Sequence, residues 1–445
     1  MSDNILKLLE GNCLKEAREA VLGMNYVDLA QLLSEMPQDK LLMVFRMLPK
    51  ETAAEVFSVM ESTEQQYIVE SITDEEVSTI LDKLFLDDTV DFIEEMPANV
   101  VKKVLKNTDE KTRRLINQLL QYPEDSAGSL MTTEFVDLKR EMTVGGALEH
   151  IRKTGMDKET IDTCYVITAQ RKLEGTVSIR TLILNIPEVF ISDIMDTNVK
   201  FVRTLDDQED TAALFKKYDL LSMPVVDKEN RLVGIITIDD VMDVIEQENT
   251  EDFHKMAAMT PSEIPYLKTN VLVLAKNRIL WLLLLMISAT LTGYIIRHYE
   301  NALAQIVALT SYIPVLMDTG GNAGSQSSTM IIRALALSEL RFRDITPVIW
   351  KEFRVGVVTG AMLALVNFGR IMLFDHVKAL VALTVCCALF CIVILAKVTG
   401  GMLPMLAQKL HMDPVIMASP LITTVVDALS LVIYFTFATY FLGIA

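Results

Sequence analysis

The chain has 445 residues, of which 51% are hydrophobic, and a formal net charge of −18. It is too long for one ordinary domain and too apolar, with a mean hydropathy of +0.33, for a wholly soluble protein. Residues 1–260 hold 50 acidic and 28 basic side chains, whereas residues 261–445 hold 9 and 13. Such an acidic first part excludes nucleic acid as an electrostatic partner, and we expect a membrane part to follow it.

Residues 1–124 predict an acidic, all-α domain. Glycine is scarce, and short amphipathic stretches end at Pro37, Pro49 and Pro97. Helices that are this short and closely spaced are typical of a superhelical stack. The start of the chain lacks the basic and apolar regions of a signal peptide, so we expect this domain to stay in the cytoplasm.

Residues 125–247 carry one pattern twice, over 125–190 and 191–247. The segment that ends at Arg180 recurs in the segment that ends at Asp239, and each copy predicts a strand, a helix, two strands and a closing helix. This α/β order resembles a tandem CBS pair. Such pairs commonly bind adenine nucleotides, and Arg180 is the candidate phosphate ligand. A solvent-exposed arginine is the alternative that the sequence leaves open.

Residues 248–277 predict an amphipathic connecting helix, and residues 278–445 predict a transmembrane domain. Lysine and arginine are concentrated in the loops that a cytoplasmic N-terminus would place inside the cell, so the C-terminus is expected outside. The chain should therefore be a multi-pass protein of the cell membrane. Five runs are long enough to cross a bilayer, at about 279–296, 302–336, 348–372, 378–406 and 414–442.

The last of these runs carries one charge, Asp427. A carboxylate inside a span costs at least ~2.5–3.5 kcal/mol, so we expect it to face water or a partner. The second run contains three glycines and the polar residues Asp318, Asn322 and Gln326. We predict a discontinuous helix that lines a binding site, with close packing through small residues as the alternative.

These two runs offer oxygen ligands only, which suit Mg²⁺ or Ca²⁺ better than Zn²⁺. The predicted pore ligands are Asp427, Asn322 and Thr423. One carboxylate per chain is few for a divalent ion. A two-fold homodimer that brings two copies of Asp427 around a largely hydrated Mg²⁺ would supply more charge.

Acidic side chains in the first part are grouped at helical spacing. Like charges on one helix face repel unless a cation lies between them. A cytoplasmic cation sensor therefore explains the grouping better than a solvated acidic surface. The predicted sensor ligands are Asp87, Asp91, Asp207, Glu209, Asp219, Asp240, Asp243, Glu248, Glu251 and Asp252.

The whole order of domains resembles the MgtE family of bacterial magnesium channels. The motifs that carry the resemblance are Tyr122-Pro-Glu-Asp-Ser-Ala-Gly-Ser-Leu-Met-Thr, Pro314-Val-Leu-Met-Asp-Thr-Gly-Gly-Asn-Ala-Gly-Ser-Gln and Ser419-Pro-Leu-Ile-Thr-Thr-Val-Val-Asp. The resemblance implies a homodimer whose pore is lined by the second and fifth spans. It also implies that intracellular Mg²⁺, bound between the soluble domains and the connecting helices, holds the pore shut. Some family members bind ATP in the CBS pair, but Thr181 stands here where an acidic residue is expected.

Other function classes stay open. A secondary transporter would exchange a divalent cation for H⁺ or Na⁺ at the same site, but five spans without an internal repeat argue against it. A membrane-anchored nucleotide sensor would have no use for Asp427 in a span. An enzyme is disfavoured because the sequence lacks GxSxG, HExxH and P-loop motifs.

Overall fold

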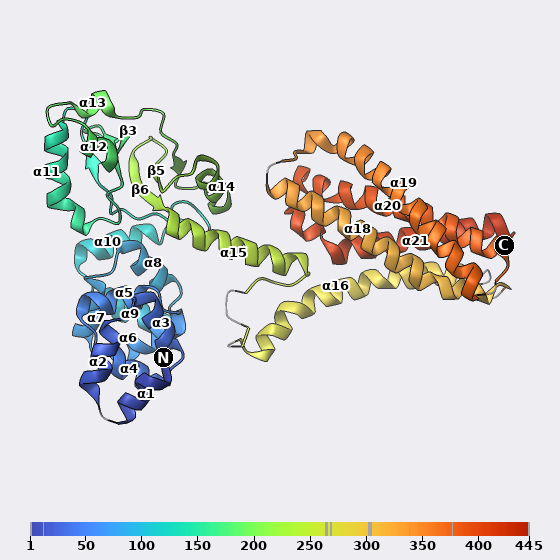
Figure 1. Cartoon of the computed structure of the whole chain (residues 1–445), viewed down its shortest axis with the longest axis horizontal. Helices are drawn as coiled ribbons and strands as arrows, with labels where there is room; N and C mark the ends of the chain where they lie inside the picture. Colours follow the sequence, from blue (N-terminus) through green and yellow to red (C-terminus); the bar gives the residue numbers. More distant parts are fainter. Residues whose placement is uncertain are drawn as a thin grey trace. The chain divides into compact units, whose positions relative to one another are not determined.

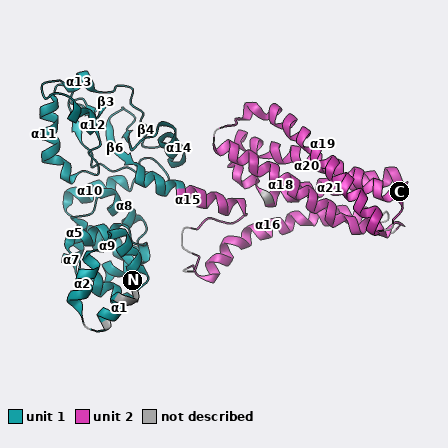
Figure 2. Cartoon of the chain, in the orientation of Figure 1, with its two compact units in different colours: residues 1–245 teal, residues 246–445 magenta. Residues whose placement is uncertain are grey.

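The chain divides into two units, residues 1–245 and residues 246–445 (Figure 2). The first unit contains short helices and two small sheets, and the second contains long helices (Figure 1). This structure is a computed structural model. It describes residues 2–11, 13–262, 266–267, 269–300, 305–337, 339–375 and 377–443.

Short helices, α1 to α10, form the N-terminal part of the first unit (Figure 1). The N-caps of α4, α5 and α9 are prolines: Pro37, Pro49 and Pro97. Proline has no backbone N–H, but at this position the N–H would have no hydrogen-bond partner inside the helix. The all-α prediction is thus confirmed. The helices are α1 (Ser2–Glu10), α2 (Leu14–Leu22), α3 (Tyr26–Ser34), α4 (Gln38–Phe45), α5 (Lys50–Ser58), α6 (Ser62–Ser71), α7 (Asp74–Leu81), α8 (Leu86–Glu94), α9 (Ala98–Asn107) and α10 (Glu110–Leu119).

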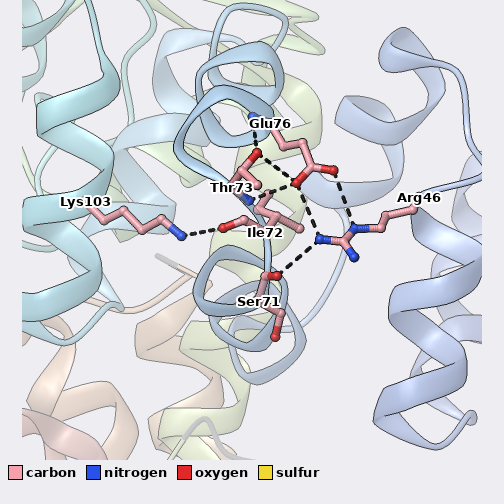
Figure 3. A network of polar contacts seen from close by, with 6 residues as sticks. All are labelled: Arg46, Ser71, Ile72, Thr73, Glu76 and Lys103. Atoms are coloured by element: carbon pink, nitrogen blue, oxygen red, sulfur yellow. Dashed lines mark hydrogen bonds and ion pairs between the residues drawn. The ribbon is translucent and has the colours of Figure 1, made fainter.

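A polar network fixes the turn between α6 and α7 (Figure 3). The Thr73 hydroxyl accepts the Glu76 N–H at 3.3 Å and the Glu76 carboxylate accepts the Thr73 N–H at 2.8 Å, a reciprocal capping box. Arg46, which follows α4, pairs with Glu76 at 3.5 Å and donates to the Ser71 carbonyl. Lys103 of α9 donates to two carbonyl oxygens of the same segment, at 2.6 and 2.7 Å. Helices that are distant in the sequence are therefore tied to one turn.

The two CBS copies each contribute a sheet that has three strands in the described residues. In both sheets the first strand pairs parallel with the second, and the second pairs antiparallel with the third. The predicted strand–helix–strand–strand–helix order is confirmed. The first copy consists of β1 (Asp137–Leu138), α11 (Val144–Thr154), β2 (Thr163–Ile167), β3 (Leu173–Ser178) and α12 (Ile179–Leu184). The second follows α13 (Ile191–Ile194) and consists of β4 (Val202–Arg203), α14 (Gln208–Tyr218), β5 (Ser222–Val226), β6 (Leu232–Thr237) and α15 (Ile238–Met256).

The prediction of one connecting helix over 248–277 is wrong. The closing helix of the second CBS copy, α15, continues without a break to Met256, and a separate helix, α16 (Val271–His298), begins after Asn270 caps it. Ala258 adopts a left-handed conformation with φ 52° and Pro261 follows, and both features oppose a helix. Residues 263–265 and 268 of this segment lie outside the described residues.

The second unit is built from long helices: α16, α18 (Ile313–Ala336), α19 (Ile345–Arg370), α20 (Ala379–Lys409) and α21 (Ser419–Leu442). Shorter segments are η2 (Val307–Tyr312), η3 (Phe342–Asp344), η4 (Ile371–Asp375) and η5 (Pro414–Met417). Four stretches of the described residues are long and apolar enough to cross a membrane, at 271–298, 342–375, 379–409 and 414–442. With 24 residues α18 is also long enough, but it carries the polar side chains noted above. Residues 302–304, where the second span was predicted to begin, lie outside the described residues.

The prediction that the second span is discontinuous is wrong, because α18 is helical through Gly320, Gly321 and Gly324. These glycines serve close packing. A Cβ on Gly324 would lie 2.8 Å from Ile422 of α21, and a Cβ on Gly400 of α20 would overlap the Gly324 carbonyl oxygen. The structure therefore shows the alternative, in which small residues let helices approach each other.

Replacing Gly400 with alanine is expected to destabilise the second unit, because α18 and α20 would have to separate. We expect the thermal midpoint of the purified chain in detergent to fall by roughly 3–10 °C, the usual effect of overpacking a core. Gly369→Ala is the matched control, since no atom lies within 4 Å of a Cβ there. Equal midpoints for the two variants would contradict this account of the packing.

Candidate ion-binding sites

A group of carboxylates lies where α8 meets the first turn of α15 and two loops of the first CBS copy. The Leu86 N–H at the start of α8 donates to Glu134 at 3.2 Å. Asp240, in the first turn of α15, accepts the Thr237 hydroxyl at 2.7 Å. We call this group the acidic cluster: Asp87, Asp88, Asp91, Glu134, Glu159, Asp239 and Asp240.

Burial, with repulsion inside the cluster added to it, raises the pKa of five carboxyls of the cluster. The pKa of Asp88 rises to about 6, those of Asp87 and Asp240 to about 7, and those of Asp91 and Glu159 to about 8. Such shifts mean that the ionised carboxylates destabilise the folded unit unless a bound cation compensates their charge. Among the described residues no three His, Cys, Asp or Glu side chains converge into a ready-made metal site. A cation would therefore have to draw these carboxylates together.

In EDTA, the free energy of unfolding of the first unit is expected to fall as the pH rises. Raised carboxyl pKa values of about 6 to 8 mean that the folded unit keeps protons that the unfolded chain has lost. The extra stability is complete below about pH 4 and is lost as the pH passes through 6 to 8, by roughly 3 kcal/mol or more. The loss of stability is measured by proteolysis of the purified chain in urea at pH 6 and at pH 8. Mg²⁺ should oppose it, and stability that rises with pH would contradict the prediction.

The structure brings only some of the predicted sensor residues into the acidic cluster. Asp87, Asp91 and Asp240 belong to it. Asp207 instead caps α14 by accepting the Glu209 N–H at 2.8 Å, and Asp219 ends the same helix with a left-handed φ of 51°. These positions have local structural roles that favour aspartate. Asp243 is exposed on α15, one turn after Asp240.

The end of α15, which belongs to the second unit, carries Glu248, Glu251 and Asp252. Lys255 pairs with Glu251 at 2.7 Å and with Asp413, just before η5, at 2.9 Å. Burial opposes the charge of Lys255, but hydrogen bonds to Asp413 and Glu251 raise its pKa. Burial and repulsion by Asp413 raise the pKa of Asp252. Sequence reasoning missed Asp413, because no local pattern links it to α15.

Asp427 lies in the N-terminal half of α21, with Thr423 one turn before it. Both face Gly321 of α18: a Cβ there would be 3.0 Å from the Thr423 methyl and 3.8 Å from Asp427 Oδ1. The Thr423 hydroxyl donates to the Pro420 carbonyl at 2.9 Å, so its oxygen lone pairs stay available. The Asp318 carboxylate is close enough to repel Asp427. Glycine at 321 thus leaves room for a carboxylate between two helices.

Asn322 lies on a different face of α18. With Asp318 and Gln326, which are one turn to either side, it lines a cavity of about 390 Å³ whose other walls come from α19 and α20. The predicted pore ligands therefore divide into two sets, Thr423 with Asp427 and Asn322 with this cavity. Asp318 belongs to both sets. It lies four residues before Asn322, a spacing that places both side chains on one face of a helix. The sequence could therefore have added Asp318 to the predicted ligands.

Arg180 is exposed in the first turn of α12, two residues beyond the end of β3. The neighbouring Thr181 donates its N–H to Ser178, which caps the helix, at 3.1 Å. Thr181 thus has a local role at the position where an acidic residue was expected.

Family models match the N-terminal helices, the second CBS copy and most of the long helices of the second unit. Residues 24–125 match the MgtE intracellular N domain, residues 191–247 match the CBS domain, and residues 313–437 match the MgtE family model described as a divalent cation transporter. The chain is 37% identical over 435 residues to the magnesium transporter MgtE of Thermus thermophilus, which covers 97% of this chain and 96% of that protein. It is 32% identical over 438 residues to the magnesium transporter MgtE of Bacillus subtilis, covering 98% and 96%.

Two solved structures resemble the first unit. The cytosolic domain of the Mg²⁺ channel MgtE in complex with ATP is 36% identical, has a TM-score of 0.53, and covers 55% of this chain and 100% of its own. The soluble part of a magnesium transporter is 29% identical, has a TM-score of 0.52, and covers 56% and 97%. Since the sequence likeness extends over nearly the full length of the chain and of its relatives, the chain belongs to the MgtE family.

Proposed function

We propose that this chain is a Mg²⁺-selective channel that mediates Mg²⁺ uptake and is closed by intracellular Mg²⁺. The observation that carries the proposal is the Asp427 carboxylate, the one charge in α21, which lies against the space left by Gly321 of α18. The relatives that match the full length are named magnesium transporters, and one matching cytosolic domain is described as part of a Mg²⁺ channel.

The proposal includes a homodimer whose axis passes between the two copies of α18 and α21. Each protomer offers Asp427, Asp318 and the oxygens of Thr423 and Asn322. Mg²⁺ gives up its water reluctantly, so two sets of carboxylates around a hydrated ion suit it better than one complete cage. With α16, α18, α19, α20 and α21 as five spans, a cytoplasmic N-terminus puts the C-terminus outside.

Closure is proposed to follow from the acidic cluster. Mg²⁺ bound there cancels the repulsion between α8 and the start of α15, and its loss restores that repulsion. Because α15 is one unbroken helix that begins in the first unit and ends in the second, it is the element that would carry the change to the pore. The remaining predicted ligands are proposed to bind further Mg²⁺: Asp207, Glu209, Asp219, Asp243, Glu248, Glu251 and Asp252.

ATP is a further proposed ligand of the CBS pair, because the matching cytosolic domain, 36% identical, is described in complex with ATP. The exposed guanidinium of Arg180 would then contact phosphate. Binding of labelled ATP to the wild-type chain, compared with Arg180→Ala, tests this assignment.

Single-channel recording from the purified chain in planar bilayers tests the main proposal. We expect unitary currents carried by Mg²⁺, which cease when Mg²⁺ is raised on the cytoplasmic side. A secondary transporter would take up Mg²⁺ without unitary currents. A nucleotide sensor with no transport role would show neither currents nor uptake, so each rival predicts a different result.

A further inference from the structure

Lys397 is a cation inside α20, more than three turns from either end of the helix. The residue is only 6% exposed. A lysine inside a membrane span is costly, and such residues mark ion pathways more often than packing sites. A methionine would fill a similar volume at this position without the cost of the charge.

The ammonium group of Lys397 reaches the pore helix α18. Its Nζ donates to Gln326 Oε1 at 3.4 Å. Both side chains line the 390 Å³ cavity together with Asp318 and Asn322. Gln326 is a neutral amide, so this hydrogen bond orients the ammonium without cancelling its charge. The positive charge therefore acts on the ion-binding groups of α18.

This charge lies beside the proposed ion path. Asp318, which lines the cavity with Lys397, is also close enough to repel Asp427. A divalent cation attracted by both carboxylates would therefore be repelled by a fixed ammonium nearby. Conduction needs binding that is strong enough to admit an ion and weak enough to release it. A fixed positive charge beside a carboxylate site weakens the binding of the cation and so allows its release.

We propose that Lys397 is a positioning residue for transport, an internal cation that weakens the binding of divalent ions along α18 and so speeds their release. The inference rests on the proposed channel function. It assigns to Lys397 an electrostatic role, which differs from a role in holding α20 against α18.

Lys397→Gln tests the proposal in liposomes that hold a Mg²⁺-sensitive dye. We expect the half-saturating external Mg²⁺ concentration to fall by about tenfold or more, and the maximal uptake rate to fall with it. Lys397→Arg, which keeps the charge, should restore both values. The matched control is Lys409→Gln, the same change at an exposed position of the same helix, which should alter neither value.

Gln326→Glu provides a second test that leaves Lys397 in place. A carboxylate at the 3.4 Å contact would neutralise the ammonium, so the half-saturating concentration should again fall. If the wild-type chain carries Mg²⁺ but neither variant shifts this concentration, Lys397 is structural and the channel proposal stands. If the wild-type chain carries no Mg²⁺ at all, the channel proposal is wrong and the inference falls with it.

Discussion

Asp427→Asn is expected to lower the rate of Mg²⁺ uptake into liposomes by about a hundredfold or more. Asparagine keeps the size of the side chain and its oxygen but removes the charge in a span that has no other. A divalent ion in this low-dielectric region loses an attraction worth several kcal/mol, and each 1.4 kcal/mol is about a factor of ten in rate. Uptake is measured with a Mg²⁺-sensitive dye inside the liposomes.

Asp427→Glu separates the effect of charge from the effect of shape. Glutamate keeps the carboxylate but moves it toward Gly321 of α18, so we expect an uptake rate between those of the wild type and Asp427→Asn. Thr436→Val is the control on the same helix, because the Thr436 side chain is exposed and its hydroxyl donates to the Val432 carbonyl one turn earlier. Wild-type uptake by a correctly folded Asp427→Asn would rule out the pore assignment and direct attention to the cavity at Asn322.

Features that depend on local pattern were predictable from the sequence. The two CBS copies follow from the repeat of the segment that ends at Arg180 in the segment that ends at Asp239. Asp427 is conspicuous because a single charge in about thirty apolar residues has few explanations. Both kinds of signal can be read from the order of residues along the chain, so they do not require knowledge of tertiary contacts.

The prediction for α18 failed for a physical reason. Glycine weakens helices in water, so Gly320, Gly321 and Gly324 together suggested a break. A helix packed against α20 and α21 in a membrane has no water to satisfy freed backbone groups, so unbroken hydrogen bonding is favoured. The missing side chains are used for close approach instead, as the contact between Gly324 and Gly400 shows.

The membership of the acidic cluster could be predicted only in part. Asp87 and Asp91 are one helical turn apart, which the sequence reveals. Glu134 and Glu159 lie in loops of the first CBS copy, far along the chain from α8, and only the fold brings them to that helix. Aspartates that cap helices, such as Asp207, look the same in the sequence as aspartates that await a cation.

The triple variant Asp87→Asn, Asp91→Asn, Asp240→Asn is expected to stay open at internal Mg²⁺ concentrations that close the wild type. Three of the seven carboxylates of the acidic cluster lose their charge, so we expect the closing concentration to rise by at least about tenfold. Uptake into liposomes preloaded with graded Mg²⁺ measures it. The control variant carries Asp28→Asn, Asp39→Asn and Glu55→Gln, three exposed acids of α3, α4 and α5.

The same triple variant distinguishes a cation sensor from a contact that only stabilises the fold. The two accounts predict opposite changes in the stability of the first unit in EDTA. Buried carboxylates whose pKa is raised by burial and by one another destabilise the first unit at neutral pH. Replacing them with asparagine should therefore stabilise that unit in EDTA and reduce the additional stability that Mg²⁺ confers. If closure were lost together with stability in EDTA, the acidic cluster would be a structural contact and the sensor would have to lie elsewhere on α15. Lost closure with increased stability in EDTA is the result that only a cation sensor predicts.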